Sequence, residues 1–153
     1  EDGTLTSEIV RTLTTLGIAD VHSHHGDFRL HIAILETKNQ PIGYRRDRQK
    51  ISGEIQKNIV ACEGRKTLTV QATLYEGASD QIRNGPFIIS EDTDYDYVDG
   101  DSIQDLAFVN SEGVFTTVLP FSLGQLESVE SAQEAANRPL HEKLAQKIVD
   151  ALF

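Results

Sequence analysis

The sequence contains no methionine and no tryptophan, and it has a single cysteine, Cys62, among 153 residues. One cysteine excludes an internal disulfide and leaves the redox compartment open. The absence of methionine leads us to expect a processed or trimmed product. No stretch approaches the roughly 20 apolar residues of a membrane-spanning helix, and no segment has the pattern of a secretory signal peptide.

Basic residues are scarce, with 14 Lys and Arg against 24 Asp and Glu and a net charge of −10. Nucleic-acid binding depends on cations that meet phosphates, so this composition argues against such a partner. The charges are also unevenly placed. Eight of the 14 basic residues lie between Lys38 and Lys66, whereas the segment from Glu91 to Glu112 holds eight acids and no base. This asymmetry predicts one basic edge on an otherwise acidic body.

Both ends of the chain read as helices. Gly17 stands where a C-cap belongs, and Thr4 or Thr6 is expected to cap the start of the first helix. Ser131-x-x-Glu134 is a capping-box pattern for the last helix, which Pro139 is expected to kink or divide. The apolar stripes at helical spacing are Leu5, Ile9, Val10, Leu13 and Leu16 in the first helix, and Leu140, Leu144, Ala145, Ile148, Val149 and Leu152 in the last.

The segments between the helices alternate apolar and polar residues, as strands do. An Asn84-Gly85 turn signal precedes the third strand, and a turn at residues 111–113 leads into the fourth. The predicted strands cover residues 28–36, 66–76, 86–99 and 113–121. We therefore predict a single α+β domain over residues 1–153. It is a two-layer sandwich with the N- and C-terminal helices on one face of a small, mostly antiparallel or mixed sheet.

A cluster of histidines follows the first helix. The order Asp20-x-His22-x-His24 resembles the opening of a metal site in barrel hydrolases, and a metal-dependent hydrolase is one hypothesis for the chain. A (β/α)₈ barrel needs about 250 residues, however, and the cluster precedes a strand instead of following one. His31 and His141 lie in no recognisable ligand motif. The favoured interpretation is a solvated polar turn that binds metal at most adventitiously.

No other catalytic motif is present. The sequence has no G-x-S-x-G nucleophile context, no phosphate loop and no dinucleotide fingerprint, and Cys62 has only Glu63 beside it, with no neighbouring base to activate the thiol. The acidic run at residues 91–101 lacks the spacing of an EF-hand. We expect no cofactor and no enzymatic activity.

The stretch YRRDRQK, residues 44–50, carries the basic residues of most interest. We expect it to form a loop entered through Pro41-Ile42-Gly43. Planar guanidinium groups bind phosphate through paired donors, so the functional interpretation is an anionic head group or an acidic partner. A solubilising loop is the alternative. The candidate anion-binding residues are Arg45, Arg46, Arg48 and Lys50.

Taken in order, these segments resemble the lipopolysaccharide-assembly lipoprotein LptE family of Gram-negative bacteria over most of the chain. The resemblance rests on five stretches: GTLTSEIVRTLTTLGI, FRLHIAILE, RKTLTVQATLYE, EDTDYDYV and SAQEAANRPLHEKLAQKIVDAL. It implies two helices packed on a small mixed sheet. It also implies a non-catalytic, periplasm-facing outer-membrane protein that plugs the LptD barrel, helps it assemble and contacts lipopolysaccharide. Arg45, Arg46, Arg48 and Lys50 occupy the loop where family members place basic residues proposed to meet the glycolipid phosphates.

Two features of the family are expected upstream of Glu1: a first strand that pairs in the sheet and, before it, a lipid-modified cysteine that anchors the protein in the membrane. The histidine turn and an insertion at about residues 102–112 are departures from the family pattern. Another envelope or phage-like structural module with the same sandwich remains a further hypothesis, because fold does not fix function.

Overall fold

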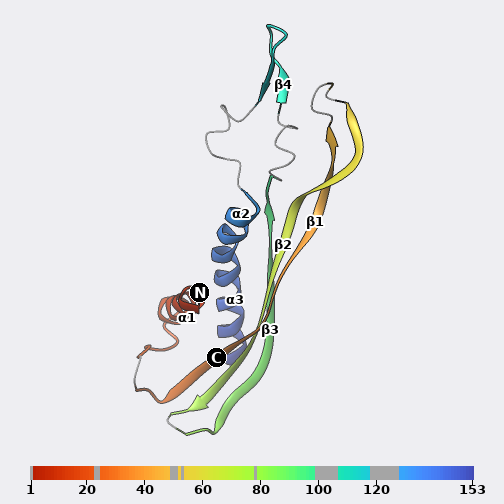
Figure 1. Cartoon of the computed structure of the whole chain (residues 1–153). Helices are drawn as coiled ribbons and strands as arrows, with labels where there is room; N and C mark the ends of the chain where they lie inside the picture. The colour runs from red at the N-terminus through yellow and green to blue at the C-terminus, as the bar shows by residue number, and fades with distance from the viewer. Residues whose placement is uncertain are drawn as a thin grey trace. The chain divides into compact units, whose positions relative to one another are not determined.

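The computed structural model describes residues 2–22, 25–48, 52, 54–77, 79–98, 107–117 and 128–153. Three long strands form one antiparallel sheet in the order β1-β2-β3, and β4 pairs with β5 in a separate two-stranded sheet (Figure 1). The predicted α+β class is confirmed. In chain order the elements are α1 (Asp2–Thr15), β1 (Phe28–Arg48), β2 (Ile55–Glu76), β3 (Ile82–Asp96), β4 (Ala107–Val109), β5 (Phe115–Thr117), α2 (Val129–Ala135) and α3 (Asn137–Leu152).

The chain divides into two compact units. The first unit comprises Glu1–Lys38, Lys66–Thr93 and Asn137–Phe153, and the second comprises Asn39–Arg65 and Asp94–Ala136. Each of the three long strands passes from one unit into the other. The single-domain assignment of residues 1–153 stays a prediction.

The hydrophobic core of the first unit lies between α1, α3 and one face of the sheet (Figure 1). Alternate residues of β2 point into it, as the period of a half-buried strand requires. Leu30 and Ile32 of β1 pack against its margin. The predicted two-layer arrangement is therefore present. The buried core residues are Leu5, Ile9 and Leu13 of α1, Leu68, Val70, Ala72 and Leu74 of β2, Ile89 of β3, and Leu140, Leu144, Ala145, Ile148, Val149 and Leu152 of α3.

Helix α1 ends as the sequence predicts. Gly17 has a φ of 64°, a left-handed conformation that glycine adopts without steric cost, and the Ile18 amide donates to the Leu13 carbonyl at 3.0 Å. The expected N-cap is wrong, because Thr4 and Thr6 both lie inside the helix.

The C-terminal helical region is divided, as predicted, but at a different residue. The break falls at Ala136, and Pro139 lies in the first turn of α3, where a missing amide proton leaves no hydrogen bond unmade. The capping box predicted at Ser131 is also wrong. The cap is one turn earlier, where the Ser131 amide donates to the Ser128 hydroxyl at 3.3 Å.

β1 and β2 are about twice as long as their apolar alternation predicts. β1 continues through the segment expected to be a loop, and it includes Pro41, Gly43 and residues 44–48. The loop assigned to residues 44–50 is therefore wrong over its first five positions. The turn assigned to Asn84-Gly85 is wrong as well, because both residues lie inside β3, next to a cis Gly85–Pro86 peptide bond.

Cross-strand partners explain the extra length of the strands in the second unit. Gly43 lies directly opposite Glu63, since a Cβ atom built on Gly43 would lie 2.6 Å from the Glu63 Cβ. The Tyr97 amide donates to the Cys62 carbonyl at 3.0 Å, which fixes the register of β2 and β3. These pairings are contributed by residues distant in sequence, so local alternation does not report them.

The β4–β5 hairpin pairs Val109 with Phe115 and turns where the sequence predicts. The Asn110 side-chain oxygen accepts hydrogen bonds from the Glu112 and Val114 amides at 3.0 and 2.9 Å, and Gly113 has a φ of 77°. An asparagine that satisfies backbone amides two residues on is a common turn-forming contact.

Truncation of the core should destabilise the first unit strongly. Leu144→Ala removes a fully buried side chain and is expected to lower the free energy of unfolding by about 2–5 kcal/mol, as measured by urea denaturation. Ile88→Ala is the control, since its side chain is 71% exposed, and it should change this free energy by less than about 0.5 kcal/mol. Equal effects of the two substitutions would contradict the position of the core.

Gly64 should not tolerate a side chain. A Cβ atom there would lie 2.5 Å from the ring of Tyr95, so Gly64→Ala must displace this ring and is expected to destabilise the protein by about 1–3 kcal/mol. Near-ultraviolet circular dichroism should report the displaced tyrosine. Gly3→Ala is the matched control. No atom lies within 4 Å of the added methyl in helix α1, and alanine should stabilise the helix by about 0.5–1 kcal/mol.

Candidate functional site

The histidine turn lies between α1 and β1, as predicted from its position before a strand. His22 and His25 stack with their ring centroids 5.0 Å apart, and both side chains are exposed, as is Asp20. His24, the third residue of the hypothetical metal site, lies outside the described residues. Over the described ranges of the chain, no three His, Cys, Asp or Glu side chains converge on a point that would hold a metal ion.

Residues 44–48 of the basic stretch are the final residues of β1, in the second unit. Arg45 is half-buried and Arg46 is exposed, as expected for neighbours on opposite faces of a strand. Arg48 is the last residue of β1, but its side chain and the whole of Lys50 lie outside the described part of the structure. Of the four candidate residues, Arg45 and Arg46 are therefore the two whose side chains the structure describes.

An exposed aromatic side chain accompanies Arg46. Tyr44, which is 58% exposed, lies two residues before Arg46 and therefore on the same face of β1. Gly43 lies opposite Glu63, so Tyr44 lies opposite Cys62, whose carbonyl accepts the Tyr97 amide. Tyr44 and Tyr97 thus belong to one row across the sheet of the second unit.

Tyr97 in turn lies beside Tyr95, with ring centroids 5.9 Å apart. The face that carries Tyr44, Arg46, Tyr95 and Tyr97 is here called the tyrosine face. Apolar rings beside a guanidinium suit ligands that combine an apolar or sugar surface with an anionic group. Sequence reasoning identified the basic residues but missed their tyrosine neighbours, because Tyr44 was assigned to a loop.

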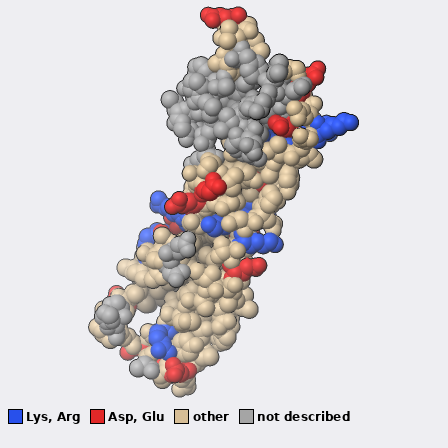
Figure 2. Space-filling view, viewed as in Figure 1, with Lys and Arg blue, Asp and Glu red and all other residues tan. Residues whose placement is uncertain are grey.

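Arg46 also differs from most other arginines in its electrostatic environment. Within the described residues, no carboxylate contacts its guanidinium. Elsewhere on the surface, basic and acidic side chains are interspersed, as the face drawn in Figure 2 shows. The arginines that do meet carboxylates form the pairs Arg11–Glu8, Arg29–Asp80, Arg65–Asp94, Arg83–Glu76 and Arg138–Glu142.

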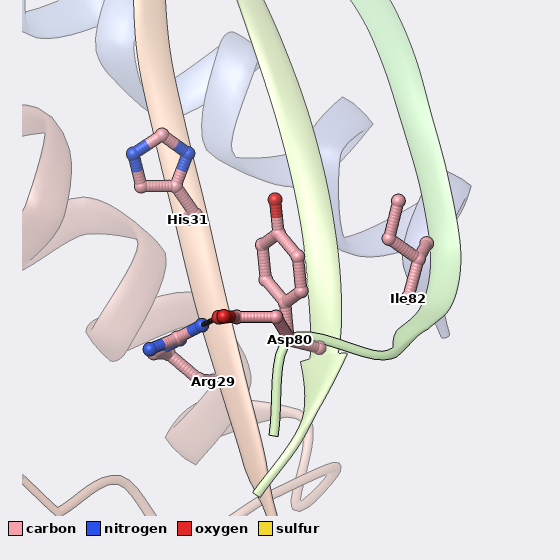
Figure 3. A pocket seen from close by; sticks show the side chains of 5 residues that line it. Arg29, His31, Asp80 and Ile82 are labelled. Atoms are coloured by element: carbon pink, nitrogen blue, oxygen red, sulfur yellow. Dashed lines mark hydrogen bonds and ion pairs between the residues drawn. The ribbon is translucent and has the colours of Figure 1, made fainter. Parts of the chain in front are cut away.

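A shallow depression marks the outer face of the sheet in the first unit (Figure 3). The Arg29 guanidinium lies 5.0 Å from the centroid of the Tyr75 ring and 2.9 Å from the carboxylate of Asp80. His31 and Ile82 complete the lining. Arg29 already contacts both the Tyr75 ring and the Asp80 carboxylate. We therefore interpret the cluster as a structural contact between β1 and the turn that joins β2 to β3.

Two lysines of α3 reach the backbone of β3 in the first unit. Lys143 and Lys147 donate to the carbonyls of Asp92 and Ser90 at 3.4 and 3.2 Å, and Lys147 also pairs with the Glu91 carboxylate. The hydrogen bond from Lys147 lowers the pKa of Glu91 below its ordinary value, against the opposing effect of burial.

His141 is a buried titratable group that sequence reasoning did not single out. It lies on the core side of α3, is 9% exposed, and makes a hydrogen bond between its Nδ1 and Thr4 Oγ1 of α1 at 3.1 Å. Its spacing of four, seven and eleven residues from Ala145, Ile148 and Leu152 places it on the apolar stripe. That spacing was the signal available in the sequence.

Comparison with known proteins adds no identification: no protein-family model matches the chain, and no curated protein matches it significantly. Of the helices in the described residues, none has the length and apolar character required to span a bilayer.

The Arg65–Asp94 pair should stabilise the sheet of the second unit more than an ordinary surface ion pair. Two parallel hydrogen bonds of 2.6 and 2.9 Å join the guanidinium to the carboxylate across β2 and β3. We expect Arg65→Gln to cost about 0.5–1 kcal/mol in the free energy of unfolding. Arg138→Gln, which removes a single 3.2 Å contact from an 83% exposed side chain, should cost less than about 0.5 kcal/mol. A double-mutant cycle with Asp94→Asn measures the coupling, and a value of zero would contradict this assignment.

Proposed function

We propose that this chain is a non-catalytic binding and assembly module of the LptE type. It associates with an LptD-type outer-membrane β-barrel, plugs and helps assemble that barrel, and assists the transport of lipopolysaccharide to the cell surface. The proposal places the protein on the periplasmic face of the outer membrane, held by a lipid anchor that precedes Glu1. No cofactor takes part.

The observation that carries the proposal is the order of the elements. A helix, three consecutive strands of one sheet, the separate β4–β5 hairpin and a C-terminal helical region occur in this order, and helices α1 and α3 pack together on one sheet face. This arrangement agrees with the one that the resemblance to the LptE family implies. Fold alone does not determine function, so the ligand class needs support of its own.

That support comes from the tyrosine face. Lipopolysaccharide combines phosphate groups with sugar rings and acyl chains. Arg46 offers exposed donors for a phosphate, and Tyr44, 58% exposed, offers an apolar ring with a polar tip next to it. Arg45 adjoins Arg46 in the sequence but lies on the opposite face of β1, so it would contact the glycolipid outside the tyrosine face. We extend the proposed contact to Arg48 and Lys50 from their sequence positions.

Co-purification tests the partner. A tagged full-length precursor should co-purify with a large outer-membrane barrel protein from detergent-solubilised membranes, and mass spectrometry should identify that protein. The variants Tyr44→Ala and Arg46→Gln should still bring down the barrel if they affect the glycolipid contact alone. A precursor without a lipid-attachment cysteine, or a protein recovered only from the soluble fraction, would contradict the proposal.

Two alternatives are open to the same experiments. Metal analysis after exhaustive dialysis tests the hydrolase hypothesis for Asp20, His22 and His24, which requires stoichiometric zinc, manganese or iron. Another envelope or structural module with this sandwich would show neither a barrel partner nor binding of the glycolipid.

Arg46 should contribute directly to glycolipid binding. Loss of one charge-assisted hydrogen bond corresponds to roughly a tenfold loss in affinity, so we expect Arg46→Gln to weaken binding to purified lipopolysaccharide by about that factor. Binding of the unmodified protein should also weaken with added salt. Arg138→Gln is the matched control, because Arg138 is exposed on α3 in the first unit. Equal losses in the two variants, or full affinity for dephosphorylated glycolipid, would show that Arg46 does not meet a phosphate.

A further inference from the structure

Polar contacts join α1 to α3 in addition to the apolar ones: Arg11 lies 3.9 Å from the carboxylate of Glu142 among exposed side chains, and a hydrogen bond forms closer to the core. Thr4 lies in the first turns of α1, and its hydroxyl meets Nδ1 of His141 on α3 at 3.1 Å. His141 is 9% exposed and shares its helix face with Leu140, Leu144 and Ala145, which are fully buried. A neutral imidazole satisfies this position with one hydrogen bond, whereas an imidazolium would place a charge in the same apolar surroundings.

The charged groups that act on the His141 ring lie on β2 and α1. Lys66 of β2 disfavours a second positive charge, and Glu8, one turn after Thr4 on α1, favours it. β3 presents Glu91 to α3, where Lys147 neutralises it. Burial is the largest influence on the ring and lowers the pKa of His141 below its ordinary value; Lys66 acts in the same direction.

Helix α1 is held mainly by this contact region. An isolated helix of 14 residues is marginal in water, and α1 carries threonines at positions 12, 14 and 15 that are poor helix formers. Its buried side chains are Leu5, Ile9, Thr12 and Leu13, against seven in α3. An element with fewer buried residues opens at lower free energy than the core helix against which it packs.

We propose that His141 acts as a pH-sensitive latch for α1. At neutral pH the uncharged ring bonds to Thr4 and holds α1 on α3. Acidification charges the ring, and α1 then leaves α3 so that the imidazolium reaches water. This device acts on the first unit and does not rest on the proposed function.

The direction of the pH effect follows from linkage. The folded state binds a proton on His141 less readily than the open state, so the closed form is favoured above the ordinary histidine pKa. That preference is lost progressively as the pH falls from about 6.5 toward the lowered value. For each unit by which the pKa is lowered, the population of the open form rises by up to about tenfold.

Hydrogen exchange measures the opening, with protection factors corrected for the intrinsic pH dependence of exchange. Between about pH 7.5 and about pH 5 the amides of α1 should lose protection, by up to about tenfold for each unit by which the pKa of His141 is lowered, while those of α3 retain theirs. Titration of the His141 ring by nuclear magnetic resonance should give a midpoint below about 6.5. Unchanged α1 protection, or equal loss of protection in both helices, would overturn the proposal.

Charge variants keep the test informative if His141→Gln does not fold. Lys66→Gln should raise the pKa of His141 and reduce the acid-induced opening, whereas Glu8→Gln should lower that pKa and increase the opening. If these residues had a merely structural role, the two substitutions would not change the acid-induced opening of α1 in opposite directions. His31→Gln, at an exposed position on β1, is the matched control and should open like the unmodified protein. Retention of the full pH effect in a folded His141→Gln would also overturn the latch.

Discussion

The apolar side of α3 buries six hydrophobic side chains between α1 and the sheet, and the first unit depends on this contact. Alternate residues of β2 meet it from one side, and the short stripe of α1 meets it from the other. The order of the chain has a consequence here. Because the helix that organises the core comes last, the N-terminal helix and the three long strands must all find the partner surface that it supplies.

The second unit depends on a different kind of interaction. Cross-strand contacts recur along its sheet: Gly43 lies opposite Glu63, Tyr95 lies over Gly64, and Arg65 pairs with Asp94. A glycine under an aromatic ring keeps the two backbones close and lets the ring cover the backbone that the glycine leaves bare. The candidate binding residues lie on this part of the sheet, whereas the buried titratable group lies in the first unit.

The fold could be predicted from the sequence where local pattern and burial coincide. The stripe of α3, the glycine that ends α1 and the alternation of residues 66–76 all give the correct element. Prediction failed where the cause is not local. Residues 41–48 contain proline, glycine and consecutive charges, and they form a strand because β2 supplies partners for their backbone. The Asn84-Gly85 turn signal was overridden in the same way.

The candidate site shows the same division. Arg45 and Arg46 were found because charge is visible in composition, and the structure places both on β1. Their tyrosine neighbours depend on the register of three strands, which no local pattern encodes. His141 was visible as a histidine, but its significance depends on a hydroxyl 137 residues away. Contacts between residues far apart in the sequence are therefore the part of this structure that could not be predicted from the sequence alone.

Two lysines of α3 contact the outer edge of β3, the last strand in the order β1-β2-β3. Because the Tyr97 amide donates to β2, the backbone groups of Ser90 and Asp92 point away from β2, toward the side of β3 where the described part of the chain supplies no further strand. Four residues of helix rise about 6 Å and two residues of strand about 6.8 Å, so Lys143 and Lys147 match two successive outward carbonyls. A further strand that paired with β3 here would have to compete with these ammonium groups for the two carbonyls.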